Sequence, residues 1–294
     1  MLISRARFAA LALFAALAAV PAQAAERFEQ GLLWRIEGKG ALASHVFGTI
    51  HLADSRVTHL PGAVTREFNQ ARSLTIEAGL DSANLIALAN RMLYADGRDL
   101  PGVAGAELFR RAAALSAGLG LPEPVLRMFK PWAVALLLSA PQQDPADVLD
   151  YVLARMATEQ GKPVLELESL DEQVSVFEGM AEAEQIILLR HAVNNFERLP
   201  QLIGRLVEAY LARDLAAMWR ISEESGGTGG DTKRLNEVFI RRLIYDRNTR
   251  MVERMGARLT EGGAFIAVGA LHLHGDRGVL SQLERRGWRV TRVY

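Results

Sequence analysis

Ala264–Gly275 reads Ala-Phe-Ile-Ala-Val-Gly-Ala-Leu-His-Leu-His-Gly, and the rest of the chain is organised around it. Its first five residues are all apolar, which is typical of a short strand buried on both faces of a sheet. Gly269 then allows the backbone to turn, and His272 follows three residues later. Because ligands collect at the carboxyl edge of open α/β sheets, His272 is the first candidate for a functional site.

A near-copy of this stretch lies close to the other end of the chain. His45-Val-Phe-Gly-Thr-Ile-His51-Leu repeats the order of apolar strand, glycine, two residues and histidine. Each copy continues into a helical run and a further strand, namely Pro61–Ala71 with Ser73–Glu77, and Gly278–Arg286 with Trp288–Val293. We therefore predict an α+β fold whose central mixed sheet is built from two related strand–Gly-x-x-His–helix–strand units. The two units should bring His51 and His272 to one site.

A large helical insertion separates the two units and spans approximately residues 81–259 of a single domain, 25–294. Within it we predict helices at Asn84–Leu93, Glu107–Leu119, Pro131–Ala140, Asp147–Gln160 and Thr232–Leu259, and a strand at Lys162–Glu168. The glycine-rich run Gly226–Gly230 is either a linker or a lid.

Residues 1–24 have the features of a signal peptide. Arg5 and Arg7 precede an apolar run of 13 residues, Phe8–Val20, and Ala22-Gln-Ala24 is a small-x-small cleavage site. The run is short for a membrane span, which needs about 20 residues, although an uncleaved anchor is the alternative. We expect a periplasmic or secreted protein that is cleaved near Ala24 and has no transmembrane segment in its mature part.

Composition excludes several classes of function. Lys and Arg number 34, and so do Asp and Glu, so no excess positive charge is present to neutralise phosphates. Nucleic acid is therefore not an expected partner. We expect a peptide or small-molecule substrate instead. The chain has no cysteine, which rules out a thiol nucleophile, a disulfide framework and a cysteine-ligated zinc. The oligomeric state has no signature in the sequence.

Four further polar residues stand in positions that suggest a site. Glu77 ends an apolar strand, and Glu168 lies at a strand-to-helix junction before the capping box of Ser169 and Glu172. Arg247 and Asn248 fall on the apolar stripe of the helix Thr232–Leu259. For Glu77 the alternative is an ordinary solvated face. For Arg247 it is a structural pair with a carboxylate, because buried arginine is uncommon unless paired.

Two imidazoles and a carboxylate make a ligand set for a divalent metal. His51, His272 and Glu77, with Glu168 as a further possibility, suit Zn, Mn, Co or Fe, with positions left open for water and substrate. The same residues could act without metal, with one histidine as general base and the other as electrophile.

The chain resembles the TraB/GumN family, which includes the Tiki proteins. The resemblance rests on Phe47-Gly-Thr-Ile-His51, Thr75-Ile-Glu77, Leu167-Glu168 with Asp171-Glu-Gln173, Tyr245-Asp-Arg-Asn248 with Met251, and Val268-Gly-Ala-Leu-His272-Leu with Gly275 and Gly278. Tiki proteins are metal-dependent proteases that prefer Mn or Co, so the resemblance implies an exported, metal-dependent hydrolase of Tiki type. A non-catalytic peptide- or haem-binding protein and a metal-independent hydrolase of erythromycin-esterase type remain alternatives.

Overall fold

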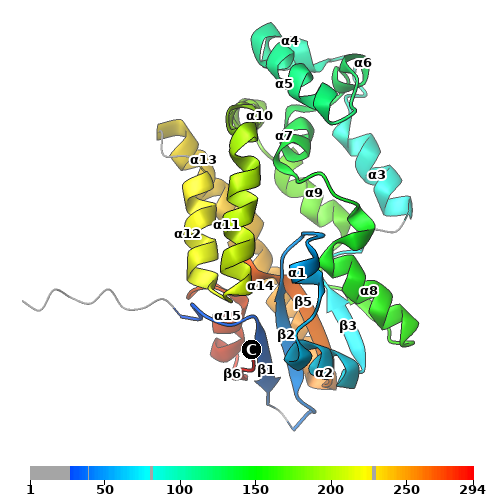
Figure 1. Ribbon diagram of the computed structural model, residues 1–294, viewed down its shortest axis with the longest axis vertical. Coiled ribbons are helices and arrows are strands. Elements are labelled where there is room, and N and C mark those ends of the chain that lie inside the picture. The colour runs from blue at the N-terminus through cyan, green and yellow to red at the C-terminus, as the bar shows by residue number, and fades with distance from the viewer. Residues whose placement is uncertain (1–26, 39, 80–81, 227–229) are drawn as a thin grey trace, which may run out of the picture.

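The computed structural model of the chain describes residues 27–38, 40–79, 82–226 and 230–294. A mixed six-stranded sheet lies at one end of an elongated molecule, and a helical body extends from it (Figure 1). The predicted α+β class is therefore confirmed. The strands are β1 (Leu33–Glu37), β2 (Ser44–Thr49), β3 (Ser73–Ile76), β4 (Val164–Glu166), β5 (Ala264–Gly269) and β6 (Arg289–Arg292). The predicted signal peptide lies outside the described residues.

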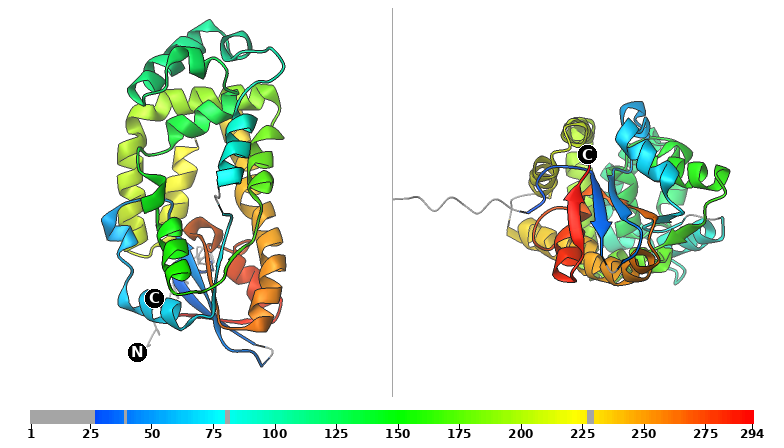
Figure 2. Two further views of the ribbon diagram at one scale, coloured as in Figure 1. Left: turned by 90° about the vertical axis from the view of Figure 1, so that its right-hand side faces the viewer. Right: turned by 90° about the horizontal axis from the view of Figure 1, so that it is seen from below.

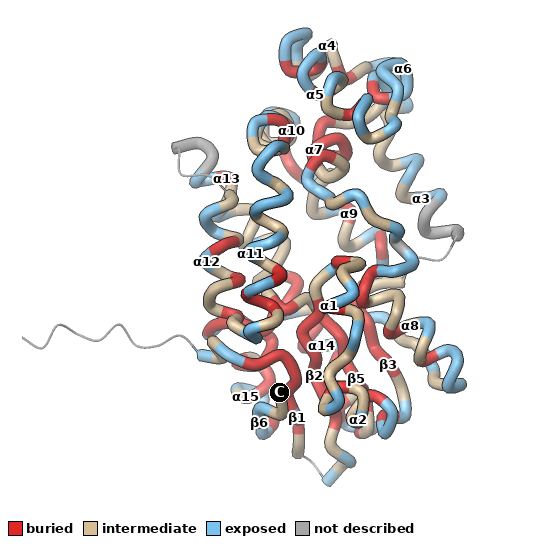
Figure 3. Tube along the Cα trace, in the orientation of Figure 1, coloured by how far each residue is buried: buried red, intermediate tan, exposed pale blue. Residues whose placement is uncertain are grey.

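The order of the strands in the sheet is β4-β3-β5-β2-β1-β6. Neighbouring strands from β4 to β2 pair in parallel, while β1 is antiparallel to both of its neighbours. β5 thus lies between β3 and β2, and its residues Ala264 through Val268 are all buried, as the continuous apolar run predicts (Figure 3). The two strands that carry the Gly-x-x-His motifs are immediate neighbours, so both motifs leave the same edge of the sheet.

Helices make up most of the remaining structure. They are α1 (Ser55–Thr58), α2 (Gly62–Gln70), α3 (Ser82–Met92), α4 (Leu100–Ala104), α5 (Ala106–Gly118), α6 (Glu123–Leu126), α7 (Pro131–Ser139), α8 (Leu149–Glu159), α9 (Leu170–Glu178), α10 (Glu182–Asn195), α11 (Leu199–Leu211), α12 (Leu215–Ser225), α13 (Gly230–Ile240), α14 (Asp246–Glu261) and α15 (Val279–Arg285). Short 3-10 turns lie at η1 (Pro145–Asp147), η2 (Phe196–Arg198) and η4 (Ala270–His272).

Helices cover both faces of the sheet. α2 lies over one face, and α14 and α15 lie over the other (Figures 1 and 2). On the first face Phe68 of α2 packs edge-on against Phe265 of β5, with ring centroids 5.2 Å apart. On the second face α14 contributes an apolar stripe of fully buried residues: Met251, Val252, Met255 and Leu259. The 3.6-residue spacing of that stripe fixes which side of α14 meets the sheet.

The insertion between β3 and β5 is not purely helical. Most of its helices extend beyond the carboxyl edge of the parallel strands, but β4 returns to the sheet and pairs with β3. β4 lies within the strand predicted at Lys162–Glu168. The return brings Glu168 back to the edge, where its backbone N–H donates to the carbonyl of Glu77 over 2.7 Å. The predicted capping box of Ser169 and Glu172 then starts α9.

The helix predicted for Thr232–Leu259 is present but interrupted. A π-helical segment, η3 (Arg241–Tyr245), separates α13 from α14. Each π turn contains more residues than an α turn, so the apolar stripe changes direction at η3. Phe239 and Ile240, just before the π-helical segment, remain partly exposed, whereas Met251 and Val252 after it are buried against the sheet.

None of the described helices is both long and apolar enough to cross a bilayer. The prediction for Gly226–Gly230 falls largely on residues 227–229, which lie outside the described residues, so the choice between linker and lid stays open.

Candidate functional site

The edge where β2 and β5 end side by side is the core of the site. Thr49 at the end of β2 lies opposite Gly269 at the end of β5, so His51 and His272 follow two and three residues beyond a shared register. Gly48 allows this close arrangement. A Cβ atom at that position would lie 2.8 Å from a methyl carbon of Leu273 and 3.1 Å from the Cα atom of Ala270. The glycine of the first motif thus lets η4, which carries the second histidine, pack onto β2.

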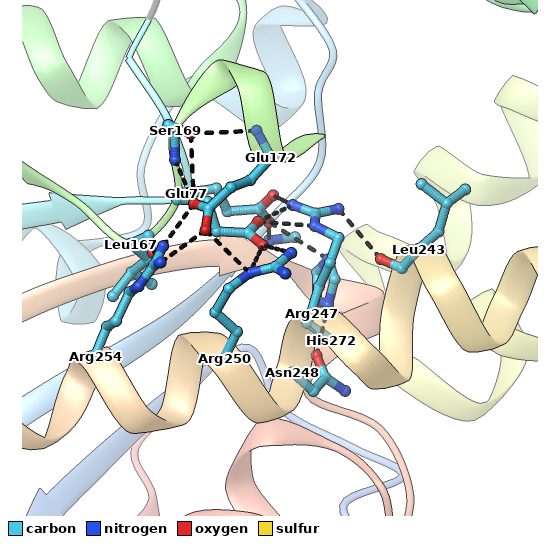
Figure 4. A network of polar contacts seen from close by, with 12 residues as sticks. Glu77, Leu167, Ser169, Glu172, Leu243, Arg247, Asn248, Arg250, Arg254 and His272 are labelled. Atoms are coloured by element: carbon cyan, nitrogen blue, oxygen red, sulfur yellow. Dashed lines mark hydrogen bonds and ion pairs between the residues drawn. The ribbon is translucent and has the colours of Figure 1, made fainter. Parts of the chain in front are cut away.

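His272 is buried, and its orientation is fixed by Asn248. Its Nδ1 atom lies 2.6 Å from Oδ1 of Asn248 (Figure 4). The Nδ2 atom of Asn248 donates to the carbonyl of Arg277 over 2.9 Å. Because the amide nitrogen of Asn248 is used by Arg277, its oxygen must face the imidazole and accept a hydrogen from Nδ1. Nε2 is therefore left with a free electron pair. Burial lowers the pKa of His272 to about 4, against the opposing attraction of Glu77.

Glu77 faces that electron pair from the end of β3. Its Oε1 atom lies 3.6 Å from Nε2 of His272 and accepts a hydrogen bond of 2.6 Å from the backbone N–H of Gly269. Its Oε2 atom accepts from Nη2 of Arg247 over 2.5 Å. Burial opposes ionisation, but the positive charges of His272 (when protonated), Arg247 and His51 lower the pKa of Glu77 to about 2. Glu77 is therefore a carboxylate at neutral pH.

Arg247 joins Glu77 to Glu168. Its Nε atom donates to Oε2 of Glu168 over 2.8 Å, while Nη2 reaches Glu77 (Figure 4). Glu168 has a fully buried side chain and receives a second arginine, Arg250, at 2.6 Å. Two arginines thus balance two carboxylates. Arg247 is therefore in a buried ion pair, as the structural alternative requires, and both of its carboxylate partners are predicted site residues, so its role in the site stays a prediction.

His51 lies at the outer side of the site and is held by Asp150. Its Nδ1 atom is 2.8 Å from Oδ2 of Asp150, and Oδ1 of Asp150 accepts from the hydroxyl of Thr49 over 2.8 Å. The imidazole side chain is 62% exposed, so its other nitrogen is accessible to a ligand. The loss of water around the imidazole would by itself lower the pKa of His51. The charge and hydrogen bond of Asp150 outweigh that effect, so the pKa of His51 is raised to about 9.

Asp150 is the site residue that the sequence does not reveal. It lies in the first turn of α8, where an acidic residue is expected at any helix start. It also lies 99 residues from His51, so no local spacing links the two. The remaining histidines stand apart from the set described here. His45 faces Glu67 at 3.5 Å, and His274 is buried with its ring stacked on Trp219 at 5.5 Å.

The donor atoms of His272 and Glu77 fit a metal ion. Two ligands bound at about 2.1 Å in tetrahedral geometry lie about 3.4 Å apart, close to the 3.6 Å between Nε2 and Oε1. Within the described part of the chain, however, no three side chains of His, Cys, Asp or Glu converge closely enough to hold an ion as they stand. His51 as the third ligand stays a prediction.

Comparison with known proteins confirms the family resemblance that rests on the sequence motifs. The sequence pattern of the TraB/PrgY/gumN family matches residues 32–292. The uncharacterized protein YbaP of Shigella flexneri is 25% identical over 258 residues, which cover 82% of this chain and 88% of that protein. Metalloprotease TIKI2 of Danio rerio is 25% identical over 84% of this chain and 58% of its own length. Metalloprotease TIKI1 of Homo sapiens is 26% identical, with 88% and 61% covered. No solved structure matches the chain significantly.

Proposed function

Since this chain belongs to the TraB/PrgY/gumN family, we propose that it is a metal-dependent hydrolase that acts on peptides. The relatives named metalloproteases support this proposal, although the chain spans only 58% of the length of one and 61% of another. The observation that carries it is the pair of electron donors, Nε2 of His272 and Oε1 of Glu77, which face each other at 3.6 Å with the imidazole hydrogen directed away.

In the proposed site His272, Glu77 and His51 hold a Mn, Co or Zn ion. Such an ion lowers the pKa of its bound water and polarises a carbonyl group. The other residues position these ligands. Asn248 holds His272 with Nε2 outward, Asp150 does the same for His51, and Arg247 fixes the carboxylate of Glu77. Partners that accept the second imidazole hydrogen are the usual outer contacts of metal-bound histidines.

The metal-independent hydrolase is the second candidate, and the His51–Asp150 pair is the observation that favours it. A carboxylate that orients an accessible histidine is the arrangement of a general base. A raised pKa of about 9 argues against this role, because His51 would already be protonated at neutral pH and could not accept a proton.

We also propose that the protein acts outside the cytoplasm, on the strength of the signal-peptide features in residues 1–24.

Removal and return of the metal test the proposal. Full-length protein is purified without a metal-binding tag, stripped with a chelator, and supplied with Mn, Co or Zn in turn while cleavage of a peptide library is followed by mass spectrometry. We expect activity to disappear with the metal and return with at least one ion. The variant His272→Ala should bind no metal, whereas His59→Ala, at an exposed histidine outside the proposed ligand set, should behave like the parent. Full activity in verified metal-free protein would exclude the metal-dependent mechanism.

A further inference from the structure

A cavity of about 820 Å³ opens among the helices beyond the sheet edge. It is bounded by α10, α11, α12, α13 and η3, and it reaches Leu271 of η4. Leu271 immediately precedes His272. Leu243, on another wall, gives its carbonyl to Nη1 of Arg247 over 3.2 Å. The cavity therefore adjoins the candidate site through Leu271 and Leu243, and its volume lies within the range of about 300–1,000 Å³ typical of ligand pockets.

The walls of this cavity are largely apolar and incompletely covered. Leu199 and Leu202 line it from α11, and Phe239 and Ile240 line it from α13. All four are partly exposed to solvent. Water-exposed apolar surface that is gathered in one hollow marks a binding site, because its burial by a ligand is favourable. The change of direction at η3 is what leaves the α13 side chains facing the hollow instead of the sheet.

Polar side chains are interspersed with this apolar surface. They include the amides of Asn195, Asn236 and Gln201 and the charged residues Arg198, Arg205 and Glu224. Arg205 is paired with Glu224 at 2.7 Å. A hydrocarbon chain would cover this mixed surface without bonding to its polar groups, whereas a peptide backbone supplies N–H and C=O groups that can bond to them. The wall chemistry thus fits a polypeptide with apolar side chains.

We propose that this cavity binds the part of the substrate next to the scissile bond, and that this part is a peptide stretch with large apolar side chains. The inference rests on the proposed function and adds the substrate class to it. Because Leu271 directly precedes His272 and the carbonyl of Leu243 accepts from Arg247, a peptide bound in the cavity would lie beside the hydrolytic residues.

Binding measured without turnover tests the inference. The probes are a fluorescently labelled peptide rich in Leu, Val and Phe, a copy of equal length with Ser, Asn and Gln at those positions, and a labelled fatty acid. Fluorescence polarisation is recorded with full-length His272→Ala protein, alone and with Ile240→Glu added. We expect the apolar peptide to bind at least about tenfold more tightly than the polar copy, and Ile240→Glu to weaken its binding by about tenfold, because a buried carboxylate without a partner is costly.

The matched control is Ile86→Glu, the same substitution at a residue that is 65% exposed on α3 and does not line the cavity. It should leave binding unchanged. Ile240→Asn serves as a second, uncharged variant, and melting curves confirm that each protein is folded. Equal binding of the two peptides, preference for the fatty acid alone, or full affinity in both Ile240 variants would overturn the inference.

The two proposals fail separately. If the apolar peptide binds in the cavity but the parent protein cleaves nothing with any metal, the hydrolase proposal fails and the binding site stands. If metal-dependent cleavage occurs with no preference for apolar peptides and no effect of Ile240→Glu, the hydrolase proposal stands and the cavity is not the substrate site.

Discussion

Nε2 of His272 and Oε1 of Glu77 face each other across 3.6 Å, and each directs an electron pair into the gap between them. The imidazole cannot supply a hydrogen to this gap while Nδ1 donates to Asn248. A proton or a metal ion between the two atoms would satisfy both. A proton on Nε2 is disfavoured at neutral pH, because burial lowers the pKa of His272 to about 4. The proposed metal ion would occupy this gap and accept both electron pairs.

The first prediction concerns Asn248, which fixes the imidazole. Asn248→Ala should lower metal affinity and activity by about 10- to 100-fold, the usual effect of removing an outer partner of a metal-bound histidine. Asn248→Asp keeps an oxygen acceptor for Nδ1 and should retain more affinity than Asn248→Ala. Competition with a chelating dye measures the metal affinity of both variants.

The control for this prediction is Asn194→Ala, which removes a surface asparagine bonded to Arg111. It should bind metal like the parent. Unchanged metal affinity in Asn248→Ala would show that Nε2 of His272 is not a ligand.

The second prediction concerns the two carboxylates that Arg247 joins. Arg247→Ala should cost about 3–5 kcal/mol of unfolding free energy, because it leaves the buried Glu77 without its charged partner. Arg247→Lys keeps the charge but cannot donate to both Glu77 and Glu168 from a planar fork. We expect Arg247→Lys to lose most activity with a smaller loss of stability. Urea unfolding and activity per folded molecule are the measurements.

Arg35→Lys, at an exposed pair with Glu37, is the matched substitution away from the site and should change neither quantity. If Arg247→Lys destabilises the protein as much as Arg247→Ala and leaves activity per folded molecule intact, Arg247 has a structural role alone.

Much of the fold could be predicted from the sequence because the two motif-bearing strands carry unambiguous local signals. The apolar run of β5 and the repeated Gly-x-x-His spacing identify two strands that end at one edge, and the structure pairs them directly. The apolar stripe of α14 likewise contains Arg247 and Asn248, whose burial follows from their position on it. Local periodicity was sufficient at these positions.

Asp150 and the π-helical segment could not be predicted in the same way. Asp150 acts through a contact with His51 that depends on how α8 lies beside the sheet, and nothing in its neighbours distinguishes it from any acidic residue at a helix start. The segment Arg241–Tyr245 contains no proline or glycine that would mark a break in the helix, so its sequence does not signal the π turn. Both depend on tertiary contacts.

The third prediction concerns processing. Given the basic residues, the apolar run and Ala22-Gln-Ala24, protein exported from an expressing bacterium should begin at Ala25 or within a residue or two. Intact-mass measurement decides this. Replacing the small residue Ala24 by Phe should block cleavage and leave the longer mass, and a parent protein of full mass in the exported fraction would contradict the prediction.

The last prediction concerns proton release when metal binds. The pKa values of about 9 for His51, 4 for His272 and 2 for Glu77 mean that only His51 carries a proton at neutral pH in the metal-free protein. A metal that binds all three must displace that proton. Metal affinity should therefore rise with pH up to about 9 and level off above it, and binding at neutral pH should release about one proton per ion. Titration calorimetry in two buffers of different ionisation enthalpy counts the protons. Asp150→Asn removes the charge that raises the pKa of His51, so the release at neutral pH should fall well below one. Metal binding without proton release in the parent would mean that His51 is not a ligand, even if His272 and Glu77 are.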